Sequence, residues 1–215
     1  MAIVQNPITG RTKKKFGTAV FSKQFGKNTM RTKPADVRNP KTIPQRQQRN
    51  KFSLLVVVAR MLMGFIRVTF KKAAVGMSPY NTFVKTNIAN VVIGDYPNFS
   101  IDYSQMKVSK GSLKGVDDGI CSPDHGQVLN ISWTDNSGNT VDAQPTDNVL
   151  ILAINDTKNA TVSDMASATR SDANVQITVP LSWVNDNVHV YMCLKVSAQD
   201  NVSDSVYLGS FPVLA

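Results

Sequence analysis

The sequence predicts an α+β protein. A basic arm with a β-hairpin (residues 1–41) and a pair of helices (residues 42–94) are expected to precede an all-β antiparallel sandwich (residues 95–215). Three observations support this class. A long, mostly apolar segment follows residue 42, short alternating runs bounded by turn residues follow Tyr96, and the net charge changes sign along the chain.

The positive charge is concentrated near the N-terminus. Residues 1–72 carry 17 of the 24 Lys and Arg side chains and one acid, Asp36, which gives +16. The rest of the chain carries 7 basic and 14 acidic side chains, which gives −7. A basic block of this size normally meets phosphate, an acidic protein surface or an anionic membrane. The acidic part of a neighbouring copy is a further candidate, and it would favour head-to-tail assembly.

The N-terminal region is expected to form an extended arm followed by a hairpin. Turn signals and a cluster of lysines occupy residues 1–15. Residues 16–22 alternate weakly, and residues 28–33 can pair with them across a turn at Gly26. Two prolines then predict an extended connection into the first helix.

A long helix is predicted over residues 43–70. Thr42 and Gln45 have the spacing of a capping box, and Pro44 lies in the first turn, where a missing N–H has little cost. The central apolar run of this helix, residues 54–65, is too short for a bilayer span and contains a charged side chain, so no transmembrane helix is expected.

The polar side chains of this helix fall on one strip. At about 100° per residue, the strip contains Arg46, Arg49, Ser53, Arg60, Gly64, Arg67 and Lys71. Its arginine stems either lie along apolar surface and reach water, or they face nucleic acid or the carboxylates of a partner. Most of the remaining circumference is apolar, so we expect an oligomer. Its interface is predicted to include Leu55, Leu62, Met63 and Ile66.

A second helix is predicted to start at Ser78 and Pro79, which suit the N-cap and first positions. Its apolar face is formed by Phe83, Ile88, Val91 and Val92, and Gly94 ends it. The two helices should form a pair joined by a short turn.

Short alternating runs dominate the C-terminal part, and Asp, Asn, Ser and Gly separate them. Strands are predicted at residues 101–109, 127–133, 148–154, 175–181, 188–196 and 205–213. Six or seven short strands over this length predict an antiparallel sandwich.

This part resembles an immunoglobulin or fibronectin-type-III sandwich. Cys121, Trp133 and Cys193 occur in the order Cys…Trp…Cys, and Tyr191 lies two residues before the second Cys, as in a tyrosine corner. The chain departs from the pattern at Cys121, which lies among turn residues. Such a sandwich is usually a spacer or adhesion module and implies no chemistry.

Most of the chain also resembles an uncharacterised family of small proteins from Bacteroidota-type bacteria and their phages. The matching residues are Asn6, Pro7, Phe16, Gly17, Met30, Arg31, Lys33, Pro34, Arg38, Asn39, Pro40, Thr42, Gln45, Arg49, Phe52, Ser205, Tyr207 and Gly209. The Asn-Pro-x-Thr-x-x-Gln-x-x-x-Arg core resembles small phage-associated proteins, which favours a virion component.

No catalytic constellation is found, and neither enzyme activity nor a cofactor is expected. His125 lies in a polar turn and His189 alternates with valines on a predicted strand, so no zinc site is indicated. Nucleotide-binding and nucleophile motifs are absent from the sequence. The loop acids of residues 117–142 lack the spacing of a calcium loop, so we interpret them as solvated.

The compartment is predicted from the N-terminus and the cysteines. Residues 1–10 lack the basic start and apolar core of a signal peptide. Two cysteines do not make a disulfide framework, which is consistent with a reducing cytoplasm during synthesis.

The expected function is structural. We predict a component of a phage or virus-like particle, a capsid or other virion protein, made in the host cytoplasm. It would associate with itself or with other virion proteins, and its basic region would contact DNA or RNA phosphates. The candidate contact residues are Lys13, Lys14, Lys15, Arg31, Arg38, Arg46 and Arg49. The alternatives are a bacterial cytoplasmic protein that binds nucleic acid without sequence preference, and a surface or adhesion module.

Overall fold

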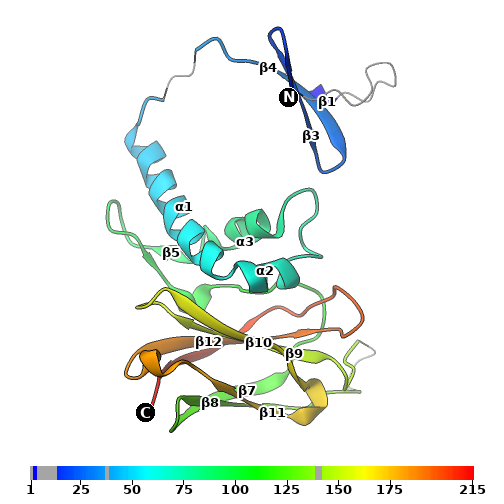
Figure 1. The fold of residues 1–215 in the computed structure, drawn as a ribbon, viewed down its shortest axis with the longest axis vertical. Coiled ribbons are helices and arrows are strands. Elements are labelled where there is room, and N and C mark those ends of the chain that lie inside the picture. The colour runs from blue at the N-terminus through cyan, green and yellow to red at the C-terminus, as the bar shows by residue number, and fades with distance from the viewer. Residues whose placement is uncertain (1, 4–13, 37–38, 139–141) are drawn as a thin grey trace. The chain divides into compact units, whose positions relative to one another are not determined.

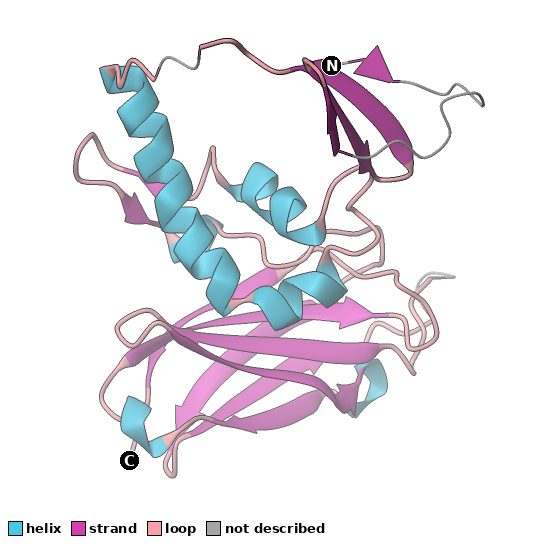
Figure 2. Ribbon diagram, turned by 45° about the horizontal axis from the view of Figure 1, so that its top comes forward, coloured by secondary structure: helices cyan, strands magenta, loops and turns pink. Residues whose placement is uncertain are grey.

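The structure is a computed structural model that describes residues 2–3, 14–36, 39–138 and 142–215. The chain divides into two compact units, Met1–Ile43 and Pro44–Ala215. Figures 1 and 2 show the ribbon. The first boundary lies close to the expected one at residue 41, whereas the helices and the sandwich, which we had expected to be separate domains, form one unit.

The first unit is a single antiparallel sheet with the strand order β1-β4-β3-β2. Its strands are β1 (Ala2–Ile3), β2 (Lys14–Phe16), β3 (Ala19–Gln24) and β4 (Lys27–Thr32). The predicted hairpin is present as β3 and β4, with Gln24 paired to Lys27. Phe25 and Gly26 connect them, both with positive φ (49° and 82°). Two positive φ values in a two-residue loop are those of a type I′ turn, whose twist matches that of the flanking strands.

The predicted long helix is bent. Helix α1 (Ile43–Met61) begins at the expected residue, but Leu62 interrupts it and α2 (Met63–Thr69) continues at 87° to α1. The Leu62 N–H still donates to the Val58 carbonyl, and the Ile66 N–H to the Leu62 carbonyl. Leu62 and Ile66 are both buried, so the bend keeps the apolar side of α2 in the core. The prediction of one straight helix over residues 43–70 is therefore wrong.

Neither α1 nor any other single helix in the described ranges combines the length and hydropathy needed to span a membrane; the bent α1–α2 pair passes that test only when its helices are counted together.

Helix α3 (Pro79–Asn87) starts as predicted, with the Ser78 hydroxyl accepting a hydrogen bond from the Asn81 N–H at 3.2 Å. It ends at Asn87, before the expected Gly94, and the Asn87 side-chain amide bonds the Lys107 backbone at 2.9 and 2.8 Å. The next residues form a small hairpin of β5 (Val92–Ile93) and β6 (Ser100–Ile101).

The C-terminal part is a seven-stranded antiparallel sandwich, as predicted. One sheet has the order β10-β9-β12-β13 and the other β11-β8-β7. The strands are β7 (Asp117–Asp124), β8 (Val128–Thr134), β9 (Asn148–Asn155), β10 (Ala160–Thr169), β11 (Asn174–Thr178), β12 (Asn187–Lys195) and β13 (Val206–Pro212). Short 3-10 turns are η1 (Tyr103–Gln105), η2 (Arg170–Asp172) and η3 (Leu181–Trp183).

The structure lacks one predicted strand and contains two that were not predicted. The run at residues 101–109 is not a strand; it contains η1 and an irregular loop. Strands β7 and β10 were missed. Each carries a register shift, between Asp117 and Ile120 in β7 and between Asp164 and Ala168 in β10. Such irregularities disrupt the alternation that identifies a strand in a sequence.

The β10-β9-β12-β13 sheet is covered on both faces. One face packs against the second sheet through Val149, Ile151 and Val190, and the other packs against the helices through Leu152 and Tyr191. Figure 1 shows the three layers of the second unit: helices, this sheet, and the β11-β8-β7 sheet. A domain boundary at residues 94–95 is therefore wrong, because the helices supply half of the core around β9 and β12.

The two cysteines lie in different cores and are both free. Cys121 is on β7, not in a turn as predicted, and faces the interior between the sheets. Cys193 is on β12 and faces the helices. Burial raises the pKa of each thiol to about 12, so both are held as neutral thiols at neutral pH.

Candidate nucleic-acid interface

The outer side of α1 carries a cationic strip. Arg46, Arg49 and Arg60 are exposed along one side of the helix, and Arg67 is exposed on α2. The predicted strip is thus solvent-facing, but its direction changes by 87° between the two helices. No acidic residue occurs anywhere in residues 37–94. This stretch of the sequence therefore adds positive charge and contributes no carboxylate.

A second set of cations gathers on one face of the N-terminal sheet. Lys15, Val20 and Arg31 face one another across three neighbouring strands. Lys27 belongs to the same face, because its partner Gln24 lies an even number of residues from Val20. Lys15, Lys27 and Arg31 are all exposed. With about 4.8 Å between strands, Lys15 and Arg31 are anchored about 10 Å apart, which suits contacts to successive anionic groups of a polymer.

This sheet has almost no core of its own. Thr29 is buried, where its hydroxyl pairs with that of Ser22 at 2.7 Å, whereas Phe25 and Met30 are 53% and 37% exposed. No other described side chain of β3 or β4 is buried. A sheet needs a hydrophobic face that is covered to be stable in water. The described strands β3 and β4 therefore bury little apolar surface within their own sheet.

The sandwich neutralises much of its charge locally. Lys107, Lys114 and Lys158 pair with Asp204, Asp117 and Asp186 at 3.7, 3.4 and 3.1 Å. Lys71, at the end of the basic region, pairs with Asp200 at 2.7 Å. Most of these side chains are more than a third exposed, so solvent screens the pairs and each contributes little to stability. Four of the 14 acids downstream of residue 72 are thereby paired, one of them with a lysine of the basic region.

The predicted contact residues fall into three groups. Lys15, Arg31, Arg46 and Arg49 are exposed on the two basic surfaces. Lys14 lies on β2, and its side chain is outside the description. Lys13 and Arg38 lie outside the described residues.

The predicted oligomer interface needs correction. Leu55, Leu62 and Ile66 are 0%, 1% and 0% exposed, and Met63 is half-buried. The three buried side chains pack inside the chain's own core with Phe65, Phe70 and sheet residues. The apolar circumference that suggested a partner subunit is thus covered by the sandwich itself.

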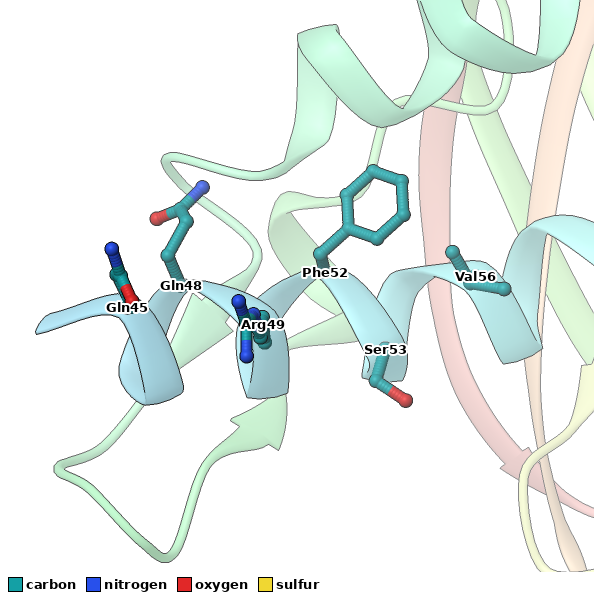
Figure 3. Close-up of a pocket in the computed structure, with 6 residues that line it drawn as sticks. All are labelled: Gln45, Gln48, Arg49, Phe52, Ser53 and Val56. Atoms are coloured by element: carbon teal, nitrogen blue, oxygen red, sulfur yellow. The ribbon is translucent and has the colours of Figure 1, made fainter. Parts of the chain in front are cut away.

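Sequence reasoning missed the face of α1 that lies between the buried side and the cationic strip. Figure 3 shows an open hollow lined there by Gln45, Gln48, Arg49, Phe52, Ser53 and Val56. Phe52 is 46% exposed. The signal was present in the sequence, because an aromatic side chain three residues after Arg49 borders the strip rather than the core.

A second missed feature is a cluster of aromatic side chains at β12 and β13. The His189 ring stacks on Tyr103 with centroids 4.4 Å apart, and its Nδ1 lies 2.9 Å from the Tyr207 hydroxyl. The Tyr191 hydroxyl donates to the Tyr103 carbonyl, so it joins the sandwich to the loop after β6 instead of forming a tyrosine corner. Burial lowers the pKa of His189, although Asp156 and Asp102 oppose this, and burial raises the pKa of Tyr103 and Tyr207. These contacts connect β12 and β13 to η1.

The described residues contain no group of three or more His, Cys, Asp or Glu side chains arranged to hold a metal ion.

The fold is therefore an α+β protein in which a helical layer covers one face of an immunoglobulin/fibronectin-type-III-like sandwich, with two basic surfaces near its N-terminus. Residues 11–209 match the family described as "Family of unknown function (DUF6266)", and the chain belongs to this family. No curated protein sequence matches it.

Two solved structures resemble about half of the chain. The fibronectin type III domain of the human collagen alpha-1(XX) chain is 12% identical with a TM-score of 0.36, covering 50% of this chain and 92% of that domain. A computationally redesigned β-sandwich protein is 12% identical with a TM-score of 0.34, covering 48% of this chain and 93% of that one.

Proposed function

We propose that this protein is a non-catalytic structural component of a phage or virus-like particle and binds nucleic acid phosphates through its basic surfaces. The observation that carries the proposal is charge segregation on exposed side chains. The cations of the N-terminal sheet and of α1 face solvent, and residues 37–94 contain no acid.

The spacing of the cations on α1 favours a polyanionic partner. Arg46 and Arg60 lie 14 positions apart, or about 21 Å along α1, with Arg49 between them. Charges are screened over about 8–10 Å at ordinary salt. Arg46 and Arg49, about 4.5 Å apart along the axis, therefore repel each other, whereas Arg60 extends the positive charge along the helix. A bound polyanion would remove that repulsion, and its counterions would be released. The −7 of the downstream chain is less than half of the +16 that needs compensation.

A protein partner is the weaker explanation for these surfaces. The sandwich acids Asp117, Asp186, Asp200 and Asp204 already pair with lysines. Support for a particle comes from the resemblance of the Asn39–Arg49 pattern to phage-associated proteins and from a sandwich that offers contact surface without chemistry. A cellular protein that binds nucleic acid without sequence preference would use the same surfaces.

The test is filter binding of the full chain to duplex DNA over a range of salt concentrations. Each phosphate contact contributes about −0.9 to the slope of log K against log salt. Replacing Arg46 and Arg60 with Gln should make the slope shallower by about 1.8 and weaken binding to all sequences alike. The matched control replaces Lys107 and Lys158, which removes the same charge from the sandwich and should leave the slope nearly unchanged.

Two results would contradict the proposal: no retention of DNA at the lowest salt, or equal losses in the two double variants. Light scattering with and without nucleic acid separates the particle from the cellular alternative. A structural component should form large assemblies of defined size, whereas a cellular binder should coat the polymer in proportion to its length.

A further inference from the structure

An exposed aromatic ring borders the cationic strip of α1. Phe52 lies on the flank of the helix that Figure 3 shows, one turn before Val56 and about 6 Å from it along the axis. Leu55 and Ala59, on the neighbouring side of the helix, are completely buried, whereas Phe52 is 46% exposed. The ring thus lies beside the buried side of α1 with much of its surface in water.

The polar groups around Phe52 are of two kinds. Arg49, one turn earlier, and Arg46 before it provide positive charge on the same side of the helix. Gln45 and Gln48 provide amide groups, each with two donors and one acceptor, and both line the same hollow. A π-surface, two amides and adjacent cations together match the three chemical parts of a nucleotide: the ring, the base edge and the phosphate.

A second copy of this chain fits the same surface poorly. Symmetric pairing around Phe52 would place the arginines of one α1 beside those of the other. The helix has no acid with which to offset that repulsion. The charge therefore favours an anionic occupant, and the exposed ring favours one with accessible aromatic faces.

We propose that α1 binds single-stranded nucleic acid, with an unstacked base on the Phe52 ring and the adjoining phosphates on the cationic strip. In a duplex the faces of the bases are covered by their neighbours, so Phe52 has nothing on which to stack. Base–aromatic stacking is tolerant of sequence, so the preference is for strandedness and not for a base sequence. This inference rests on the proposed function and specifies the kind of nucleic acid.

The experiment measures binding of the full chain to oligo(dT) and to a duplex of the same length, at one low salt concentration. Phe52→Ala and Phe52→Leu remove the ring, and Phe52→Leu keeps an apolar side chain. Phe52→Trp keeps a stacking surface. The matched control is Val57→Ala, which truncates a side chain of similar exposure (49%) on the far side of the cationic strip.

Wild type should prefer the single strand. Both ring-removing variants should weaken single-strand binding by about 5- to 150-fold, the range expected for one stacked base. Their duplex binding should not change. Phe52→Trp and Val57→Ala should bind like wild type, and circular dichroism melts should show that all variants are folded, because Phe52 is not a core residue.

Three outcomes overturn the inference. Equal affinity for single strand and duplex leaves nucleic-acid binding intact but removes the strand preference. Loss of binding in Phe52→Ala but not in Phe52→Leu shows that an apolar contact suffices and that no base stacks on the ring. Failure of wild type to bind either nucleic acid overturns the proposed function and this inference with it.

Discussion

Arg170 is the side chain whose loss should most damage the sandwich. It is fully buried, and its guanidinium donates to Asp147 Oδ2 from Nε at 3.2 Å and from Nη2 at 3.0 Å. It also donates to Asn136 Oδ1 and to the carbonyls of Lys114 and Gly115. One side chain thereby joins three loops that converge at one end of the two sheets.

The perturbation is Arg170→Met, which keeps an unbranched apolar stem and removes every donor. Asp147 is 1% exposed and its Oδ1 has no hydrogen-bond partner among the described residues. After the substitution, its carboxylate keeps the backbone N–H of Gln144 but loses its counter-charge. Removing one member of a buried ion pair costs about 3–5 kcal/mol. With a urea m-value of about 2 kcal/mol/M, the midpoint of unfolding should fall by about 1.5–2.5 M.

The assay is urea unfolding followed by tryptophan fluorescence. Trp133 is a local reporter, because its Nε1 donates to the Arg170 carbonyl at 2.8 Å. The control is Lys158→Met, which breaks the more exposed pair with Asp186 and should destabilise the protein far less than Arg170→Met. The double variant Arg170→Met/Asp147→Leu should recover most of the lost stability, since no unpaired charge remains. A loss below about 1 kcal/mol in Arg170→Met would refute the reasoning.

Three further predictions concern the joint between helices and sandwich. A fragment of residues 95–215 should aggregate, because it exposes the side of β9 and β12 that the helices normally cover. Residues 44–215 should instead give a cooperative melt by circular dichroism. Equal stability of the two fragments would contradict this prediction. Tyr191→Phe removes the bond to the Tyr103 carbonyl and should lower the free energy of unfolding by about 0.5–1.5 kcal/mol in urea titrations. The pKa of His189 in the folded protein lies below its unfolded value of about 6.5. Its contribution to the free energy of unfolding is therefore complete above pH 6.5 and is lost as the pH falls through the folded pKa. His189→Phe should make the free energy of unfolding depend less on pH in that acidic range. An unchanged pH dependence would show that His189 is not the group responsible for the loss of stability.

Local signals in the sequence predicted local structure well. The start of α1, the Ser78 cap and the Gly26 turn each depend on a few adjacent residues, and the structure confirms all three. The bend at Leu62 was not predictable in this way, because it depends on which side of α2 meets the sheet.

The predicted domain boundary at residues 94–95 was wrong because the continuous apolar pattern of β9 was not taken into account. Residues 149–155 of β9 are all buried, and their run of apolar side chains does not alternate. A continuous apolar strand indicates cover on both faces. That cover comes from the other sheet on one face and, on the other face, from the helices that we had assigned to a separate domain.

The candidate site was partly predictable. Exposure of Arg46, Arg49 and Arg60 follows from helical periodicity alone, as does burial of Leu55. The mistaken interface arose because periodicity shows that a face is apolar but not what covers it. The hydrogen bonds of Arg170 could not be predicted from the sequence, because its side-chain partners lie 23 and 34 residues away in the chain.

Photo-crosslinking tests most directly whether the basic surfaces bind nucleic acid. The full chain would be irradiated with oligo(dT), digested and analysed for peptide adducts by mass spectrometry. Adducts are predicted in peptides of the N-terminal sheet and of α1, with Phe52 among the modified positions, and they should disappear at high salt. Adducts confined to the sandwich strands, or none under conditions in which the DNA is retained on a filter, would contradict the account.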